Sequence, residues 1–495
     1  MDNQFPLPGP TSLTPEVAQP APVSPLPLPE EAAPPPPGYE PPPSAAAPII
    51  HPSPLKIVVP IAVGLIVIGL IAFLASKLFS SKPTAPTAPT KTVTLTYYGL
   101  WEPSTVMQPV IDAFQKQNPT IKVNYQLQSP QDYQDRLQTA LQDPNPPDIV
   151  RLHTTWLPLF AKSLLPAPPN TLSATEVSTN FYPIVSQLLV ANNQVYGIPV
   201  TVDGLALYIN TAMFQQKSLQ PPKTWEDLLT AAKTLTEADP VTSKITRAGV
   251  ALGNTVNVDH WPDIVSLMLM QAGVKLSDLK GDAVSTTLSY YTDFVTKYHV
   301  WDDTLPPSVV AFANEKVAMI IAPSWRAREI KEINAALSWQ VVPVPQLPDV
   351  DPTTWASIWF EGVAKGSKHP QEAWKFISFL ASANAQQILF DAATVDRSYP
   401  QPPANKAVAI VASKNPVVAA YLSGMDNART FYTASQTRDA KTALNFRLIK
   451  YLEDAVNSSG RGQEMNKVIE TLRNGFVQVL SQYGLVPSPA PSPTP

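Results

Sequence analysis

The chain of 495 residues contains no cysteine, which excludes disulfide bonds, thiolate metal sites and cysteine nucleophiles. Charged residues make up only 15 % of it, and the formal net charge is −4. Nucleic-acid binding needs a basic surface, so the composition predicts no nucleic-acid partner. The five histidines are scattered, and no phosphate-loop, zinc-protease or serine-hydrolase motif occurs. We therefore expect no cofactor and no enzymatic activity.

One group of residues comes near to a metal-binding pattern. His260 lies between Asp259 and Asp263 in the sequence, and all three are residue types that bind metals. A solvent-exposed start of a helix is the simpler interpretation. No metal is predicted.

Proline is the residue in excess. The chain has 57 prolines, and 19 of them lie between Met1 and Pro54. Such a segment buries too little apolar surface to fold, so we expect a disordered tail over 1–55 with polyproline II character. It can act as a spacer or present ligands to a proline-binding module. A proline-threonine linker is predicted at 79–91 and a second disordered tail at 486–495.

The single long hydrophobic run lies between Lys56 and Lys77. Its 20 uncharged residues span about 30 Å as a helix, the thickness of a membrane interior, and predict one transmembrane helix over 56–78. Lysines follow this run, whereas the tail before it has no lysine or arginine except Lys56. The charges that flank the run therefore favour a cytoplasmic position for the residues on its C-terminal side.

Strands and helices alternate from Val93 onward. Alternating apolar residues predict strands that begin near 93, 121 and 146, and helical apolar faces lie between them. Strand–helix–strand units of this length imply right-handed crossovers and an open parallel sheet. The fold class that these patterns favour is α/β.

The most informative stretch runs from Tyr196 to Leu229 and reads YGIPVTVDGLALYINTAMFQQKSLQPPKTWEDLL. It combines a Gly-Pro turn with a strand in which Leu205, Leu207 and Ile209 alternate with other residues. Two prolines then stop the chain. A helix opens at Thr224, which is a good N-cap, and acidic residues occupy its first turn.

This order of motifs resembles bacterial extracellular solute-binding proteins of family 1, the sugar-type receptors of ABC importers. FANEKVAMIIAPSW at 312–325 and QEAWKFISFL at 371–380 resemble further stretches of the family, although Glu315-Lys316 stands where Gly-Lys is usual. The resemblance covers roughly Lys91 to Tyr483 and implies a two-lobe fold of the type II periplasmic-binding-protein class. The expected ranges are about 92–200 and 350–398 for the first lobe, and about 203–345 and 402–485 for the second, within a solute-binding domain at 92–485.

The resemblance implies a function as well as a fold. A sugar or oligosaccharide would bind in the cleft between the lobes, the lobes would close about a hinge, and the cargo would pass to an ABC transporter permease. The chain would be a monomer in the cell membrane, with its solute-binding domain extracytoplasmic, against the indication of the flanking charges. Lacking cysteine, it cannot carry the lipid-modified cysteine that tethers many receptors of this family. Alternatives are a non-sugar solute, such as a peptide or polyol phosphate, and a surface adhesin or sensor without a transport role.

Sugar sites combine aromatic rings, which stack on the apolar faces of the sugar, with a few polar groups that bind its hydroxyls. The best candidates lie at strand ends and in hinge segments, where ligands gather in α/β proteins. Trp101 can instead cap the core, and Arg326 can instead pair with Glu329 one helical turn away. The predicted ligand-binding residues are Trp101, Glu102, His153, Trp156, Asp203, Trp261, Trp325, Arg326, Trp359 and Glu361.

Overall fold

The computed structural model describes residues 92–397, 399–435 and 443–487. The predicted proline-rich tail, transmembrane helix (56–78) and linker all precede residue 92 and lie outside these ranges, as does most of the predicted tail at 486–495. Across the described ranges, none of the helices combines the length and the apolar character needed to cross a membrane.

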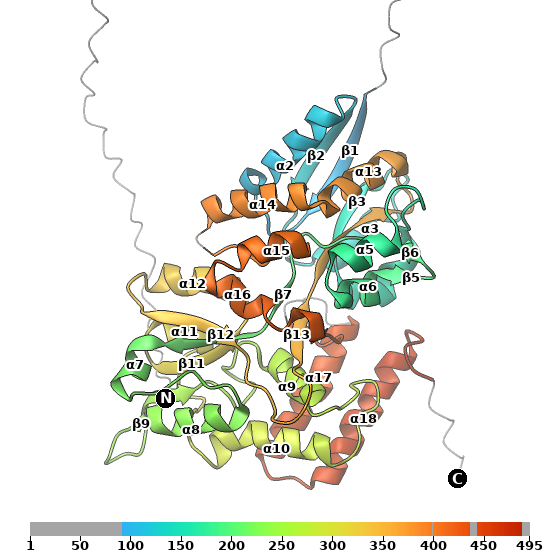
Figure 1. Cartoon of the computed structure of the whole chain (residues 1–495). Helices are drawn as coiled ribbons and strands as arrows, with labels where there is room; N and C mark the ends of the chain where they lie inside the picture. Colours follow the sequence, from blue (N-terminus) through green and yellow to red (C-terminus); the bar gives the residue numbers. More distant parts are fainter. Residues whose placement is uncertain (1–91, 398, 436–442, 488–495) are drawn as a thin grey trace, which may run out of the picture. The chain divides into compact units, whose positions relative to one another are not determined.

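The described chain is built around two five-stranded sheets, each with its own apolar core (Figure 1). We call the elements around the first sheet the first lobe and those around the second sheet the second lobe. The first sheet has the order β2-β1-β3-β14-β4. Its strands are β1 (Val93–Gly99), β2 (Ile121–Leu127), β3 (Ile149–His153), β4 (Leu164–Leu165) and β14 (Trp359–Ala364).

The first sheet is mixed rather than fully parallel, which corrects the sequence-based expectation. Strand β1 pairs in parallel with β2 and β3 through the predicted helical crossovers, whereas β14 runs antiparallel to β3. The reason is that β14 comes from a distant part of the chain and reaches the sheet from the second lobe, without a crossover helix. The helices that pack in this lobe are α2 (Ser104–Gln117), α3 (Tyr133–Ala140), α5 (Ala174–Asn180), α6 (Pro183–Leu189), α13 (Pro370–Ala381), α14 (Ala383–Asp396) and α15 (Lys406–Ala412).

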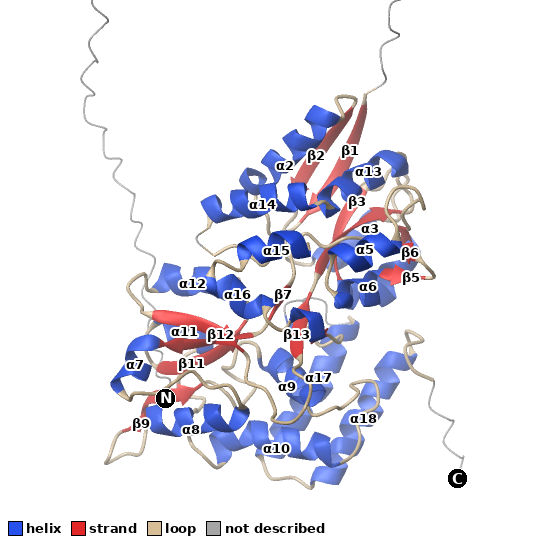
Figure 2. Cartoon of the chain, viewed as in Figure 1, coloured by secondary structure: helices blue, strands red, loops and turns tan. Residues whose placement is uncertain are grey.

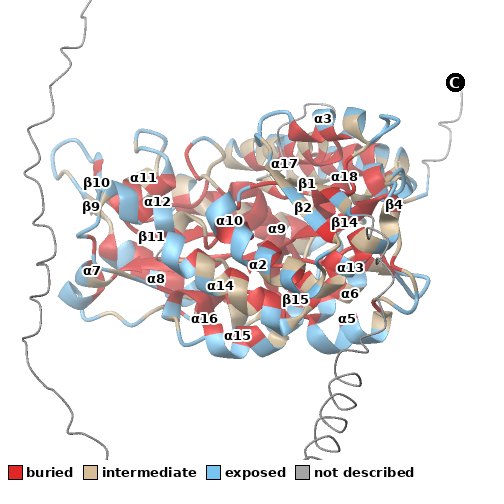
Figure 3. Cartoon of the chain, turned by 90° about the horizontal axis from the view of Figure 1, so that it is seen from above, coloured by how far each residue is buried: buried red, intermediate tan, exposed pale blue. Residues whose placement is uncertain are grey.

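The second sheet has the order β12-β8-β11-β10-β9. Its strands are β8 (Ala206–Asn210), β9 (Glu237–Ala238), β10 (Ile245–Val250), β11 (Val317–Ala322) and β12 (Trp339–Pro343). The predicted strand at β8 is confirmed, but all five of its residues are buried, so its alternation does not mark one exposed face. The strand lies between β11 and β12, and its complete burial shows that both faces of the sheet are covered there. Figure 3 shows the buried residues of the described chain in red.

Helices flank the second sheet and extend below it in Figure 2. The predicted N-cap of α8 is confirmed, because the Thr224 side chain accepts a hydrogen bond from the Asp227 N–H and Asp227 accepts one from the Thr224 N–H. The helices of this lobe are α7 (Thr211–Gln216), α8 (Trp225–Leu235), α9 (Trp261–Gln271), α10 (Asp282–Thr296), α11 (Ser308–Ala313), α12 (Arg326–Ile333), α16 (Pro416–Leu422), α17 (Leu444–Gly460) and α18 (Met465–Ser481).

Short strands join the two lobes. Strand β7 (Asp203–Gly204) leads into β8 of the second sheet, and β13 (Thr354–Ser357) leads into β14 of the first. The two pair antiparallel, and β15 (Ala428–Arg429) adds to β13 in parallel. We call β7 and β13 the hinge pair. The remaining short elements are η2 (Thr154–Trp156), α4 (Leu157–Phe160), η3 (Ala161–Ser163), β5 (Val190–Ala191), β6 (Gln194–Val195) and η4 (Met425–Asn427).

Candidate functional site

The loop after β1 presents an aromatic ring to solvent from a strained backbone. Trp101 has φ = 68°, the left-handed region, and 47 % of its surface is exposed. Few bulky residues adopt this conformation, because it crowds Cβ against the backbone. The loop is held in place by Tyr125 of β2, whose hydroxyl donates to the carbonyl of Glu102 at 2.6 Å. Unusual backbone conformations of this kind concentrate at binding sites.

A second aromatic ring comes from the second lobe. Trp325 is the N-cap residue of α12 and directly follows the turn that ends β11. The Tyr208 hydroxyl donates to the Pro323 carbonyl at 3.1 Å, and the Ser324 N–H donates to Asp203 at 3.1 Å. The turn that carries Trp325 is therefore fixed from the strand beneath it and from the hinge pair.

Residues from both lobes line a cavity of about 230 Å³. Trp101 and Trp359 of the first lobe lie edge to face with ring centroids 5.9 Å apart. Trp325 and Arg328 come from the second lobe, and the remaining wall comes from the segment between α14 and α15. We call this cavity the aromatic cleft. It is lined by Trp101, Trp325, Arg328, Trp359, Arg397, Tyr399 and Gln401.

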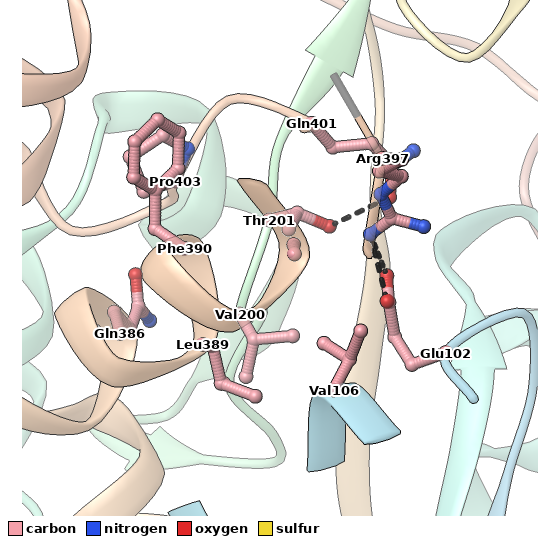
Figure 4. A pocket seen from close by; sticks show the side chains of 11 residues that line it. Glu102, Val106, Val200, Thr201, Gln386, Leu389, Phe390, Arg397, Gln401 and Pro403 are labelled. Carbon is pink, nitrogen blue, oxygen red and sulfur yellow. Dashed lines mark hydrogen bonds and ion pairs between the residues drawn. The ribbon is translucent and has the colours of Figure 1, made fainter. Parts of the chain in front are cut away.

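An ion pair closes one side of the aromatic cleft. Nη2 of Arg397 donates to both carboxylate oxygens of Glu102, at 2.7 and 2.9 Å, as Figure 4 shows. Glu102 is only 3 % exposed, so this pair is largely shielded from water. Arg397 and Gln401 also line a smaller cavity of about 20 Å³ beside α14 (Figure 4). The pair joins the loop after β1 to the end of α14 and so fixes two walls of the cleft together.

Asp203 is buried at the hinge, and its carboxylate is hydrogen-bonded to three segments of the chain. Its carboxylate accepts hydrogen bonds from the N–H of Gly204 (2.7 Å), from the N–H and hydroxyl of Ser324, and from the side-chain amide of Gln401 (3.2 Å). Burial raises the pKa of Asp203 to about 6, although these hydrogen bonds favour the ionised form. The side chain links the hinge pair to the turn before Trp325 and to Gln401 of the cleft wall.

Glu361 lies inside the first lobe, away from the lining of the cleft. It is fully buried, 3.3 Å from Nη1 of Arg151, and it accepts a hydrogen bond from the Tyr97 hydroxyl at 2.9 Å. Burial raises the pKa of Glu361, and the neighbouring Arg151 acts in the opposite direction. Loss of either partner would leave an uncompensated buried charge and strongly destabilise the folded protein.

His153 and Trp156 support Trp359 from behind. The ring of His153 lies 5.0 Å from that of Trp359, and the ring of Trp156 lies 5.2 Å from it. His153 is buried, its Nε2 lies 3.1 Å from the Ser357 hydroxyl, and burial lowers its pKa to about 3. It is therefore neutral at physiological pH and acts as a packing and hydrogen-bonding group.

Trp261 and Arg326 do not line the cleft. Trp261 begins α9 and is buried in the second lobe. Arg326 pairs with Glu329, the alternative predicted for it, and its Nε–H also donates to Nε2 of His260 at 2.9 Å.

The interpretation of the region around His260 as a solvent-exposed start of a helix is wrong. His260 and Asp263 are 4 % and 2 % exposed, because the segment before Ser435 packs over them and the Ser435 N–H donates to Asp263 at 2.9 Å. Asp259 instead accepts hydrogen bonds from Ser308 and Val309 at the start of α11. In the described ranges, acidic and histidine residues form no group of three that could hold a metal ion.

The structure thus divides the predicted site residues into three sets. Trp101, Trp325 and Trp359 meet in the aromatic cleft, and the other seven lie beneath it or elsewhere. Sequence reasoning missed Arg328, Arg397, Tyr399 and Gln401. Two signals were available: Arg328 follows Trp325 by three residues at the start of one helix, and the other three lie close to the predicted boundary between the lobes at about 398–402.

Residues 110–421 match the sequence model of the family described as bacterial extracellular solute-binding protein. The chain belongs to this family. It is accordingly a solute-binding protein and not an enzyme, as the sequence predicted.

Two named relatives of this solute-binding protein come from streptococci. It is 23 % identical over 349 residues to the multiple sugar-binding protein of Streptococcus mutans, and this alignment covers 66 % of this chain and 80 % of the relative. It is 25 % identical over 296 residues to the maltooligosaccharide ABC transporter solute-binding lipoprotein of Streptococcus pneumoniae, covering 52 % of this chain and 66 % of the relative.

Solved structures of similar proteins confirm the fold. An ABC transporter solute-binding protein of Thermotoga lettingae, bound to α-D-tagatose, aligns with a TM-score of 0.59 and 22 % identity over 79 % of this chain and 100 % of its own. The cyclic α-maltosyl-1,6-maltose binding protein of Arthrobacter globiformis aligns with a TM-score of 0.64 and 16 % identity. This alignment covers 79 % of this chain and 100 % of the Arthrobacter protein. The two-lobe, periplasmic-binding-protein-like α/β fold predicted from the sequence is therefore confirmed.

Proposed function

We propose that this solute-binding protein captures a sugar or oligosaccharide in the aromatic cleft. The observation that carries the proposal is the meeting of Trp101, Trp325, Trp359 and Tyr399 around one cavity. Aromatic rings bury the apolar face of a sugar ring, while a few polar groups at the edge fix its hydroxyls. Arg328, Arg397 and Gln401 occupy that edge. The saccharides named for the relatives and for the structural neighbours support this ligand class.

Binding would proceed by closure of the lobes about the hinge pair. A ligand favours the closed state only by the contacts it gains there, so it must contact both lobes. Trp101 and Trp359 would hold it from the first lobe and Trp325 from the second. The side chains of Glu102, His153, Trp156, Asp203 and Glu361 would position these rings without touching the ligand.

The loaded, closed form would then deliver its cargo to an ABC permease. The protein would act extracytoplasmically as a monomer, held to the cell membrane by the predicted helix at 56–78. The family's description as extracellular supports this location, as does the relative named as an ABC transporter lipoprotein. A chain without cysteine needs a different anchor from a lipoprotein, and a transmembrane helix would supply one.

Thermal unfolding of the purified full-length chain tests the ligand class. Ligand at a hundred times its Kd stabilises the native state by about 2.7 kcal/mol, which for a domain of this size raises Tm by about 3 °C. We expect such a shift with mono- or oligosaccharides and none with peptides or polyol phosphates. A shift with peptides or polyol phosphates alone would keep the fold and overturn the ligand class. No shift with any class would favour a surface adhesin or sensor.

A further inference from the structure

We propose that the saccharide carries a carboxylate, as a uronate does, and that this group binds between Arg328 and Arg397. The inference rests on the proposed function, since it specifies the chemistry of a ligand in the aromatic cleft. It depends on which polar groups reach the cleft and on the bonds that they already make.

The carboxylates near the cleft are already bound within the protein. Both oxygens of Glu102 accept from Arg397, and both oxygens of Asp203 accept from protein donors. Glu361 is fully buried beside Arg151. Among the described residues, no acidic side chain lines the aromatic cleft. A neutral sugar would therefore find no carboxylate there to accept from its hydroxyls.

The polar groups that do line the cleft are mostly donors. Arg397 uses only Nη2 for Glu102, which leaves the N–H groups of its Nη1 for a ligand, whereas its Nε–H is enclosed by protein. Arg328 uses only its Nε–H, which donates to Glu332 at 2.7 Å. Each guanidinium has five N–H donors in a planar fork that matches a carboxylate. Both arginines therefore have N–H groups to spare for a ligand.

The two arginines come from opposite sides of the cleft. Arg328 belongs to α12 of the second lobe, while Arg397 ends α14 of the first. Closure brings these positive charges toward each other, and the aromatic walls exclude part of the water that would screen them. Each guanidinium already has a protein carboxylate beside it, so an anion between them relieves no net repulsion but gains two charge-assisted contacts, one to each lobe. A carboxylate on the ligand would therefore favour the closed state more strongly than a neutral group in the same place.

Matched saccharides test this inference by calorimetric titration of the full-length chain. The probes are trimers of galacturonate, glucuronate and mannuronate and the corresponding neutral trimers of galactose, glucose and mannose. We expect one uronate trimer to bind at least tenfold more tightly than its neutral counterpart, with an affinity that falls as salt rises. Arg328→Gln should cost that uronate about tenfold more in affinity than it costs the neutral trimer.

Two further variants make the assignment specific. Arg473→Gln is the matched control, because Arg473 is also a half-exposed helical arginine near an acidic residue but lies on α18, away from the cleft. It should change neither affinity. Arg397→Lys keeps a positive charge beside Glu102 but loses the fork, and it should also weaken the uronate selectively.

The outcomes separate this inference from the proposed function. A neutral trimer that binds as tightly as its uronate, or an Arg328→Gln variant with an unchanged uronate affinity, would overturn the carboxylate assignment and leave a sugar-binding cleft. Binding of none of the six trimers would overturn both.

Discussion

Trp101 combines an unfavourable backbone conformation with a ring that lines the aromatic cleft. Its left-handed backbone costs about 1–2 kcal/mol relative to glycine, while glycine loses up to about 1 kcal/mol more backbone entropy on folding. We therefore expect Trp101→Gly to be as stable as Trp101→Ala or slightly more stable, because both lose the ring and its contact with Trp359 while only glycine relieves the strain, and we expect both to weaken saccharide binding.

Calorimetric unfolding and ligand titration of the same preparation check this. Trp101→Ala is the control, since it removes the ring but keeps the strain. If Trp101→Gly were clearly less stable than Trp101→Ala, the backbone at this position would not be strained as described.

Asp203 makes the folded state less stable as pH rises, because its pKa is raised by burial. Burial raises its pKa to about 6 in the folded state, against 3.8 ordinarily. The folded protein therefore binds more protons than the unfolded chain between these values, and the contribution of Asp203 is fully present below about pH 4 and lost as pH rises through 6. A shift of two pKa units corresponds to about 3 kcal/mol.

Comparison with Asp203→Asn isolates this contribution from those of other buried acids such as Glu361. We expect the free energy of unfolding of the wild type, minus that of Asp203→Asn, to fall by about 2 kcal/mol between pH 4 and pH 7. Urea unfolding at several pH values measures it. A difference that does not change with pH would contradict the raised pKa of Asp203.

At the scale of elements, the hinge pair depends on a close approach of two backbones. A Cβ added to Gly204 would lie 2.5 Å from the Trp355 carbonyl oxygen, too close for any residue but glycine. Gly204→Ala should therefore separate β7 from β13, lower Tm by several degrees and weaken ligand binding.

Gly460 supplies the matched control for this prediction. An added Cβ there meets Thr292 at an ordinary 3.7 Å, at the end of α17. Gly460→Ala should leave Tm unchanged or raise it slightly. Equal effects of the two substitutions on Tm would show that the contact between β7 and β13 is not critical.

Elements defined by local patterns were predictable from sequence, and those defined by distant partners were not. The N-cap at Thr224 depends on residues within a few positions, and it was found where predicted. The antiparallel entry of β14 depends on a partner strand about 200 residues earlier, which no local pattern reveals.

The same distinction applies to the candidate site. Tryptophans at strand and helix ends indicated Trp101, Trp325 and Trp359, and these three do meet. That Glu102 is bound by Arg397, nearly 300 residues away, follows only from the fold. The role of these residues in binding stays a prediction.

For the whole molecule, we predict that ligand brings the lobes together. The absence of cysteine allows clean labelling of introduced pairs. Lys122→Cys with Lys217→Cys places one exposed label in each lobe. We expect the distance between the labels, measured by electron spin resonance, to shorten when saccharide is added, because ligand contacts on both sides favour closure.

A pair within one lobe controls for effects on the labels themselves. Lys217→Cys with Lys280→Cys lies wholly in the second lobe, and its distance should not change. If saccharide bound without any change in the first pair, closure about the hinge pair would be excluded.

Whether the aromatic cleft binds the saccharide is best decided by titration calorimetry of Trp325→Ala. Trp325 is half-buried at the cleft, so its loss should leave Tm nearly unchanged. A central aromatic contact is worth about 2 kcal/mol or more, so we predict that affinity falls about 30-fold or further. A folded Trp325→Ala variant that binds the saccharide as tightly as the wild type would show that the ligand binds elsewhere.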